Sequence, residues 1–563
     1  MTVSNGTRSW QEIAHDYQKH RDETVARVDP AIPDAPAKLP LNVTGLPKQL
    51  LSAREIEITE QTVPELKQKL STGEWKCVDV IKAFLRRAGL GQKLVNCVAE
   101  LLPERAIKRA EELDQYLEEH KRPIGPLHGI PISVKEHLGM KGLDLNAGFC
   151  SFVGKVPDED AHLLKILWEA GCVFYVRSTQ PQTLMHLETS SNLCGVTVNP
   201  FNRALTCGGS SGGEGALQGI GGSILGIGSD IGGSIRSPAA NNGAYGFRPS
   251  TYRLPTGGYA SAMPGADSIV GVVGPLSNSL EGIELFMQTV IDAQPWLKEP
   301  SLVPLPWKQP DPNWFTDHSG KFKIKVGVLW TDEVVKPHPP VLRALKEVVE
   351  KLKQTEGYEI VEWKPYKHDL AWDIIASLYF PDGGAKESAA IDSSGEPWRP
   401  LSEFIIKDNP LVKAHSIDDI WFWHRQRNEY RTDYAKLWNS TAVKDHGKGV
   451  LEGAVDVILC PVGPGAAPPI NCARYWGYTS QWNLLDYPSV VFPVTKVKPD
   501  VDVTETDYKP LNDQDEYNYK LYEPELYRDA PVALQLVARR YEDEKVLKAL
   551  ELIQKATGAP FEK

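Results

Sequence analysis

The sequence predicts an α/β protein in which helices cover both faces of a β-sheet. Hydrophobic residues make up 41% of the 563 residues and charged residues 24%, so the chain can fill a large packed core. Between residues 128 and 178, an apolar run (HGIPISVK), a segment with helical spacing (EDAHLLKILWEAG) and a second apolar run (CVFYVRS) follow one another. Alternation of strand-like and helix-like segments is typical of a sheet with helices on both sides.

An N-terminal arm is expected to precede one large domain. Residues 9–28 are polar and read as a helix, whereas the prolines spaced over 30–47 prevent regular structure. We therefore assign residues 1–58 to the arm. Apolar residues recur at helical spacing over 59–114, which predicts a helical layer at the start of a single domain, 59–563.

The remaining elements are predicted from the same two patterns, apolar runs for strands and apolar residues at helical spacing for helices. After CVFYVRS the chain is rich in glycine up to residue 233, and the stretch from 498 to 525 is acidic and is expected to lie on the surface between two strands. Further strands are expected at KIKVGVLW (323–330), DVILCPV (456–462), PSVVFPVT (488–495) and VALQLVA (532–538), with a closing helix at EDEKVLKALELIQKA (542–556).

Charge and composition exclude several classes of protein. The net charge of -11 and the lack of a Lys and Arg cluster argue against nucleic acid binding. The N-terminus has no basic region followed by an apolar stretch, and no segment offers about 18 consecutive apolar residues. We therefore expect a soluble, cytoplasmic protein without integral membrane contact. The eight cysteines form no C-x-x-C pair, which favours reduced thiols and no metal site.

Two serine turns rich in glycine carry the strongest chemical signal. In GGSSGGEGAL, glycines surround Ser210 and Ser211 just before a run compatible with a helix, so N–H groups at the helix start could face a ligand. In GSDIGGSIRSP, Ser234 follows Ile231 and two glycines. Consecutive N–H groups there could surround a carbonyl oxygen, with Ser234 beside it as a nucleophile.

Each turn alone also has an ordinary interpretation. Glycine and serine are common turn residues without any catalytic role. The stretch 208–212 further matches G-x-S-x-G, the elbow of α/β-hydrolases, which would make Ser210 the nucleophile of an esterase with Asp and His partners. The region lacks both the G-K-[ST] ending of a phosphate loop and a G-x-G-x-x-G motif, so no nucleotide cofactor is expected.

A serine nucleophile needs a base, and Lys135 is the candidate. Its segment is largely apolar, and burial disfavours the charged ammonium form, which lowers a lysine pKa into the range of a base. If Lys135 instead pairs with Glu136 or is solvated at the strand end, it has no role as a base. His128 and His137 are the alternatives for a base of the histidine type.

Taken together, the motifs GIPISVKEH, CGGSSGGEGAL and GIGSDIGGSIRSPAA resemble the amidase signature family. Within it the chain resembles fungal acetamidase-type general amidases and fatty acid amide hydrolase. The similarity covers about residue 60 to the end, with the signature core at about 128–250. It extends through TVNPFN, CPVGPGAAPP, YTSQWNLLDYPSVVFPV and APVALQLVARRYEDEKVL.

The resemblance implies a fold, a reaction and a catalytic triad. The expected fold is the amidase signature fold, an α/β/α sandwich around a large mixed sheet. The expected reaction is hydrolysis of a small-molecule carboxylic acid amide through an acyl-enzyme, without a cofactor. Ser234 corresponds to the nucleophile, Ser210 to the relay that follows a cis peptide bond, and Lys135 to the base. The serine interval of 24 residues is that of the family.

Supporting roles are also implied by position. The N–H groups of residues 231–234 (Ile231, Gly232, Gly233 and Ser234) would form the oxyanion hole, with Ser210 beside the substrate. Ser211 and Ser229 are expected beside Lys135, and Asp230 and Arg236 as an ion pair at the nucleophile turn. The expected pocket residues are Leu184 and Met185 on the acyl side, with Gly148, Phe149, Cys150, Tyr478 and Trp482 as weaker candidates.

Three functional alternatives stay open at this stage. The family also contains glutamine-dependent amidotransferase subunits, which hand ammonia to a partner, and an amidase scaffold can serve as a noncatalytic binding protein. The esterase with Ser210 as nucleophile is the third. A homodimer is compatible with the sequence.

Overall fold

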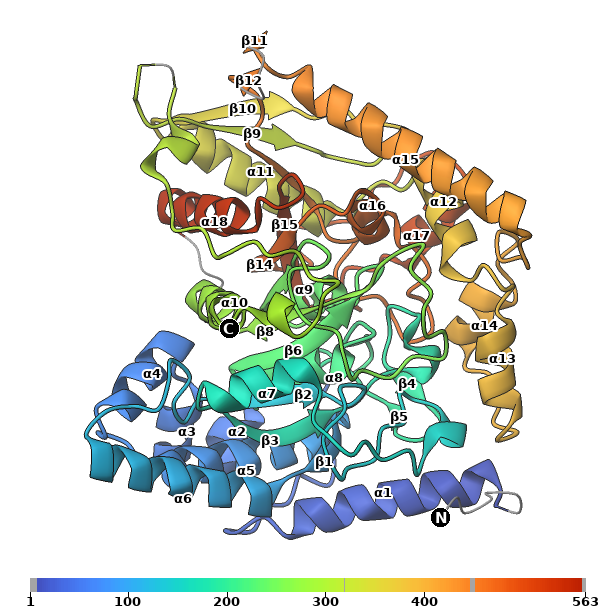
Figure 1. Cartoon of the computed structure of the whole chain (residues 1–563). Helices are drawn as coiled ribbons and strands as arrows, with labels where there is room; N and C mark the ends of the chain where they lie inside the picture. Colours follow the sequence, from blue (N-terminus) through green and yellow to red (C-terminus); the bar gives the residue numbers. More distant parts are fainter. Residues whose placement is uncertain (1–7, 318, 446–450, 559–563) are drawn as a thin grey trace.

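A single mixed sheet of eleven strands runs through the molecule. Figure 1 shows the computed structural model. The structure describes residues 8–317, 319–445 and 451–558. In spatial order the strands are β1 (Val98–Leu101), β3 (Val173–Ser178), β2 (Pro131–Lys135), β6 (Leu225–Asp230), β8 (Val272–Ser277), β7 (Tyr245–Arg248), β14 (Ser489–Lys496), β15 (Pro531–Val537), β13 (Val457–Pro461), β9 (Ile324–Val328) and β10 (Tyr358–Glu362).

Strand direction explains where a site can form. Strands β2, β3 and β6 are mutually parallel neighbours, as are β13, β9 and β10, whereas every other pair is antiparallel. Because β2 pairs with β6 in parallel, Lys135 and Asp230 end their strands at the same edge of the sheet. Ligands of open α/β sheets bind outside such carboxyl ends.

Helices cover both faces of this sheet, and strand β14 shows how its alternating side chains reach them. Val491 packs with Ile235 and Ala239 of the nucleophile segment, whereas Val490 and Phe492 join the large core that includes the last helix. Opposite directions for successive residues are the ordinary consequence of strand geometry. The expected α/β fold, with a mixed sheet and helices on both faces, is confirmed.

The helices are distributed along the whole chain. Two small ribbons, β4 (Ser190–Ser191) with β5 (Gly195–Val196) and β11 (Lys444–Asp445) with β12 (Leu451–Glu452), lie outside the main sheet. The α-helices are α1 (Trp10–Ala26), α2 (Leu46–Leu50), α3 (Ala53–Thr59), α4 (Val63–Ser71), α5 (Cys77–Val95), α6 (Pro103–His120), α7 (His162–Glu169), α8 (Gly212–Gly219), α9 (Arg236–Asn241), α10 (Leu280–Asp292), α11 (Pro339–Lys353), α12 (His368–Tyr379), α13 (Ala385–Asp392), α14 (Pro400–Ile406), α15 (Ile417–Asn439), α16 (Gly477–Leu485), α17 (Asp513–Leu521) and α18 (Asp543–Thr557).

Among the described residues of the expected arm, helix α1 is followed by chain without a helix or strand over 27–45, and then by two short helices, α2 and α3, that were not expected. Helix α1 begins after Ser9, whose side chain accepts a hydrogen bond from the Glu12 N–H, while Glu12 bonds back to the Ser9 N–H. This capping box satisfies two N–H groups at the helix start. Helix α1 lies along β1, and His20 contacts Glu100 of that strand at 3.2 Å. Residues 1–7 of the predicted arm lie outside the described residues.

Most sequence-based elements are found, and the structure adds several that were not expected, among them the helices α10, α11, α12 and α15. The expected strands at 128–135, 172–178, 323–330, 456–462, 488–495 and 532–538 correspond to β2, β3, β9, β13, β14 and β15. Strand β6 (LGIGSD) was not expected, because its glycines weaken any strand pattern. The acidic stretch 498–525 contains a short helix, α17.

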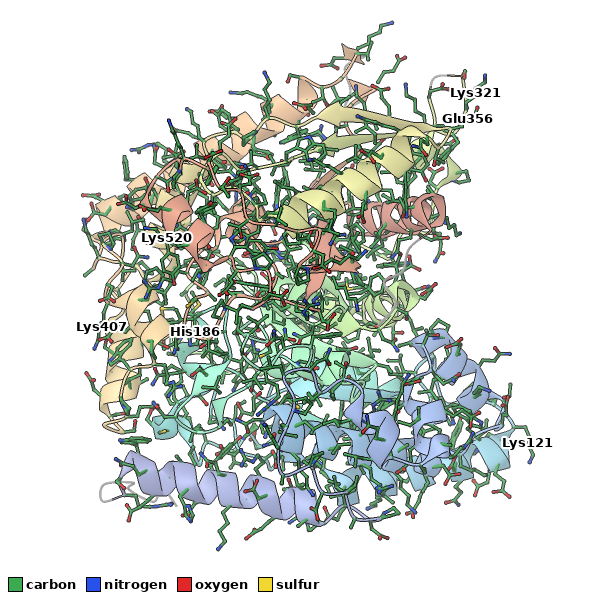
Figure 2. All side chains as sticks on the ribbon, turned by 180° about the vertical axis from the view of Figure 1, so that it is seen from behind. Lys121, His186, Lys321, Glu356, Lys407 and Lys520 are labelled. Carbon is green, nitrogen blue, oxygen red and sulfur yellow. The ribbon has the colours of Figure 1, made fainter. Side chains whose placement is uncertain are left out.

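Lys121, Lys321 and Lys407 stand at separate edges of the molecule in Figure 2, whereas the labelled His186 is buried within the fold. Among the described helices, none is both long and apolar enough to cross a membrane.

Candidate active site

Lys135 lies at the carboxyl end of β2 and is completely buried. Its Nζ is 2.7 Å from Ser210 Oγ and 3.0 Å from Ser229 Oγ. Burial lowers the pKa of Lys135 to about 7, although the carboxylates of Asp230 and Glu214 act in the opposite direction. A lysine with such a pKa can exchange a proton with a neighbouring hydroxyl near neutral pH.

Glu136, the alternative partner for this lysine, faces elsewhere. Its carboxylate accepts hydrogen bonds from the Asn146 and Ala147 N–H groups, at 2.8 and 3.0 Å, and contacts Arg177 at 3.2 Å. The side chain of Lys135 is therefore directed at hydroxyl groups rather than at its sequence neighbour.

Ser210 and Ser211 hold the two serine turns together. The peptide bond Gly209–Ser210 is cis, and a Cβ on Gly209 would collide with the backbone of Glu188. The Ser211 N–H donates to the Ser234 carbonyl at 3.1 Å. The Ser211 hydroxyl accepts from the Ser229 N–H at 3.2 Å. Ser211 thereby ties the Ser210 turn to β6 and to the Ser234 turn.

The Ser234 turn is folded around the Asp230 carboxylate. This carboxylate accepts hydrogen bonds from the Gly233 N–H at 2.9 Å and from the Ile235 N–H at 3.1 Å. It also forms a two-pronged pair with Arg236, in which both N–O distances are 3.0 Å. Both side chains are fully buried. Such a pair is costly to break because it would leave one charge buried and uncompensated.

The charge of Asp230 is stable in this environment. Burial alone would raise the pKa of Asp230, but Arg236 outweighs it and holds the pKa well below its ordinary value. Asn483 of α16 also donates to this carboxylate, at 2.9 Å. Arg236 in turn donates to the Thr479 carbonyl at 2.9 Å, so α16 supports both partners of the ion pair.

The backbone N–H groups before Ser234 differ from one another. The Gly233 N–H, expected to face an oxyanion, donates instead to Asp230. Among the described residues, the N–H groups of Ile231, Gly232 and Ser234 have no acceptor. Tyr379 donates to the Ile231 carbonyl at 3.0 Å and thereby orients the Gly232 N–H, which points the opposite way across the same peptide plane. Three N–H groups thus stay free to bind an oxygen.

A cavity of about 670 Å³ opens in front of these groups. Ser210, Ser229 and Ser234 line it, together with Leu184 and Met185 of the predicted acyl side. Within the described chain, Ser234 Oγ has no hydrogen-bond partner. The site therefore combines an unengaged hydroxyl, a serine bonded to a buried lysine, and free N–H donors, which is the equipment for attack on a carbonyl group.

The other predicted pocket residues lie elsewhere. Phe149 belongs to an apolar cluster behind Leu184, and a Cβ on Gly148 would collide with the carbonyl of Pro181. Cys150 is buried beside Ile13 and Tyr17 of α1.

Helix α16 contacts the site with a different face from the one that carries the predicted residues Tyr478 and Trp482. The Tyr478 hydroxyl donates to the Val335 carbonyl at 2.5 Å, and Trp482 packs edge-on against Tyr434 of α15. The residues that contact the nucleophile turn are Thr479 and Asn483, one position later. Sequence reasoning missed both, although their spacing of four matches one helix face.

The alternative with a histidine base has no geometric support. His128 lies 3.9 Å from Cys77 Sγ, away from both serine turns. His137 lines the cavity, but its ring contacts the Ala260 carbonyl at 3.4 Å rather than Ser210. All eight cysteines are free thiols, and the described residues contain no cluster of three His, Cys, Asp or Glu side chains that could hold a metal ion.

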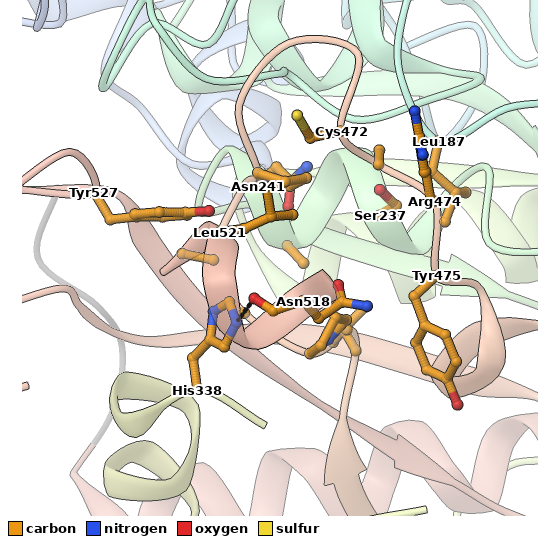
Figure 3. A pocket seen from close by; sticks show the side chains of 18 of the residues that line it. Leu187, Ser237, Asn241, His338, Cys472, Arg474, Tyr475, Asn518, Leu521 and Tyr527 are labelled. Carbon is orange, nitrogen blue, oxygen red and sulfur yellow. Dashed lines mark hydrogen bonds between the residues drawn. The ribbon is translucent and has the colours of Figure 1, made fainter. Parts of the chain in front are cut away.

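A second, smaller cavity of about 60 Å³ lies beside α9 (Figure 3). Ser237 and Asn241 of that helix line it, with His338, Arg474 and Tyr527 from distant segments. None of Lys135, Ser210 and Ser234 is among its lining residues. The chemistry therefore belongs to the larger cavity.

Comparisons with known proteins agree with this geometry. A model of the amidase family matches residues 79–547. A Schizosaccharomyces pombe protein that carries an amidase name is 46% identical over 97% of this chain and 99% of its own. An acetamidase of Emericella nidulans is 40% identical over 98% and 99%. A solved structure of fatty acid amide hydrolase is 34% identical, covers 98% of this chain and 95% of its own, and superposes with a TM-score of 0.90.

The fold and the site thus define a hydrolase that acts on amides. The chain belongs to the amidase signature family.

Proposed function

We propose that this amidase cleaves a carboxylic acid amide to the acid and ammonia or an amine, with Ser234 as nucleophile, Ser210 as proton relay and Lys135 as base. The observation that carries the proposal is the 2.7 Å contact between Lys135 Nζ and Ser210 Oγ inside a site where burial lowers the lysine pKa to about 7. A neutral lysine there accepts the Ser210 proton, while Ser210 accepts the proton of Ser234.

The deprotonated Ser234 oxygen attacks the amide carbon, and the carbonyl oxygen becomes an oxyanion. The N–H groups of Ile231, Gly232 and Ser234 are free to stabilise it, and removing one such donor typically costs about 3 to 4 kcal/mol. Ser210 then donates its proton to the departing nitrogen and regains one from Lys135. Water attacks the acyl-enzyme ester by the same relay, which releases the acid and restores the Ser234 hydroxyl.

The size of the cavity favours substrates larger than acetamide. A volume of about 670 Å³ falls in the range of about 300 to 1,000 Å³ typical of pockets for drug-sized ligands. Leu184 and Met185 make part of its wall apolar. We therefore propose an acyl group with several carbon atoms.

The test is release of ammonia or amine from a panel of aliphatic and aryl amides by the purified chain alone. Ser234→Ala should lower kcat by about 10⁴-fold or more without unfolding the protein, because the residual rate then depends on binding and the oxyanion donors alone. Retained activity in Ser234→Ala with none in Ser210→Ala would favour the esterase-like scheme. Turnover without partner chains would exclude an obligate amidotransferase subunit.

A further inference from the structure

One acidic side chain on the wall of the Ser234 cavity has no partner within the described residues. Glu387 lies in the first turn of α13 and is only 2% exposed. Its Oε2 is buried without a hydrogen bond, and no described side chain or backbone group binds its other oxygen. Buried polar groups are normally hydrogen-bonded, so a carboxyl group left open on a substrate cavity indicates a ligand contact.

The other acids of this cavity are satisfied by the protein itself. Asp230 is bound by Arg236 and by backbone N–H groups. Glu299 contacts His162 at 2.9 Å and accepts from the Thr256 and Gly257 N–H groups, both at 3.1 Å. Glu387 is therefore the exception among the described carboxyl groups that line the cavity.

The surroundings of Glu387 hold it in place without offering it a counter-charge. Ala390 and Ile391 of α13 pack with Phe149, and Leu184 lies against the same cluster. Burial raises the pKa of Glu387 to about 8, and the negative charge of Asp382 adds to this effect. Among the described residues, no lysine or arginine counts among the causes of this pKa shift. The helix that carries the carboxyl group is held by apolar packing, and the carboxyl group itself can still bind a cation or a hydrogen-bond donor.

A second wall residue has the same character. His137 lines the cavity, its Nε2 has no partner in the part of the chain that the structure describes, and its Nδ1 lies 3.4 Å from the Ala260 carbonyl. Burial and the charge of Lys135 hold the pKa of His137 well below its ordinary value. The ring is therefore neutral, and with Nδ1–H directed at Ala260 its Nε2 is an acceptor.

We propose that Glu387 binds an amino group on the acyl portion of the substrate, so that the preferred substrates are amides of ω-amino acids. The acyl side is indicated because Leu184, at the predicted acyl wall, shares its apolar cluster with α13. A bound ammonium group favours the charged carboxylate and forms a charge-assisted pair with it, and His137 offers a further acceptor in the same cavity. This inference rests on the proposed amide hydrolysis at Ser234.

The experiment compares amides that differ only in their terminal group. Three pairs have matched length: 4-aminobutanamide with pentanamide, 6-aminohexanamide with heptanamide, and 8-aminooctanamide with nonanamide. The measured quantity is the ratio of kcat/KM for the amino amide to kcat/KM for its alkyl partner. In the wild type this ratio should exceed one for at least one length.

Three variants test whether Glu387 causes the preference for amino amides. Glu387→Gln, which keeps the shape of the side chain, and Glu387→Leu should each lower the ratio by roughly 10- to 100-fold, as expected for loss of a hydrogen bond to a charged group. Glu299→Gln is the matched control, because its carboxylate is already bound by the protein, and the ratio should not change. Glu387→Leu should also raise the Tm, since it removes an unpaired buried carboxyl group.

The outcomes separate this inference from the proposed function. A wild type that hydrolyses the alkyl amides but never prefers an amino amide overturns the role of Glu387, as does an unchanged ratio in both Glu387 variants. If no amide of either kind is hydrolysed by the folded wild type, the proposed hydrolysis itself is wrong. Should Glu387→Leu fail to fold, the Glu387→Gln ratio still decides.

Discussion

The Ser234 turn and the α13 wall face the same cavity but satisfy their acidic residues in opposite ways. Asp230 accepts hydrogen bonds from the side chains of Arg236 and Asn483 and from three backbone N–H groups of the turn, whereas Glu387 has no described partner. The first region is fixed before any substrate arrives, as preorganised catalysis requires. The second leaves its binding capacity open. The contrast teaches that one cavity can combine a rigid catalytic end with an end that awaits its ligand.

Removing the charge of Asp230 should have the largest effect on the rigid side. In Asp230→Asn, Arg236 stays buried without its counter-charge, which typically costs about 3 to 5 kcal/mol of stability. Because the same carboxylate holds the Gly233 and Ile235 N–H groups, we also expect kcat of the folded fraction to fall by about 100-fold or more. Urea unfolding and amide turnover measure the two effects.

Asp486→Asn is the control for that variant. Asp486 is also buried and pairs with Arg248 at 2.8 Å, but neither residue lines the cavity. This variant should lose comparable stability and keep its kcat. If both variants lose kcat equally, the Asp230 pair has only a general structural role.

The pH dependence of kcat/KM should report the protonation of Lys135. Lys135 accepts a proton only in its neutral form, and its pKa is about 7. As pH falls below that value, the protonated fraction rises and kcat/KM should decline about tenfold per pH unit; above it the rate should level off. Activity that is constant between pH 5 and 8, with circular dichroism showing intact protein, would contradict Lys135 as base.

Thr479→Val should give the smallest of these effects. Its hydroxyl donates to the Gly232 carbonyl at 2.6 Å, and losing one such bond costs about 1 to 2 kcal/mol, or roughly 5- to 30-fold if it acts through kcat. Tyr478→Phe is its neighbour and control, because that hydroxyl binds the Val335 carbonyl. A lower kcat in Tyr478→Phe and not in Thr479→Val would reverse the assigned faces of α16.

The features that could be predicted from the sequence are those set by short stretches of the chain. The apolar run around Lys135 correctly indicated a buried strand, and of the four N–H groups predicted for the oxyanion hole, those of Ile231, Gly232 and Ser234 have no described acceptor. It missed Thr479 and Asn483 because all nine residues of α16 are buried, so no polar face marks how the helix is rotated. Packing against α12 and α15 fixes that rotation.

Glu387 was missed for a related reason. In the segment AKESAAID it reads as an ordinary acidic residue of a helix's first turn, which usually faces solvent. Its burial depends on tertiary packing of α13 beside the segment that contains Phe149, far earlier in the chain.

The contacts of α16 also bear on when the enzyme becomes competent during synthesis. Asn483 and Asp230 are separated by 253 residues, and the Thr479 bond to Gly232 spans 247. A nascent chain that has already extended past the signature region therefore lacks the side chains that hold its nucleophile in place. Because domains fold as units when their segments become available, hydrolytic capacity should arrive late in translation.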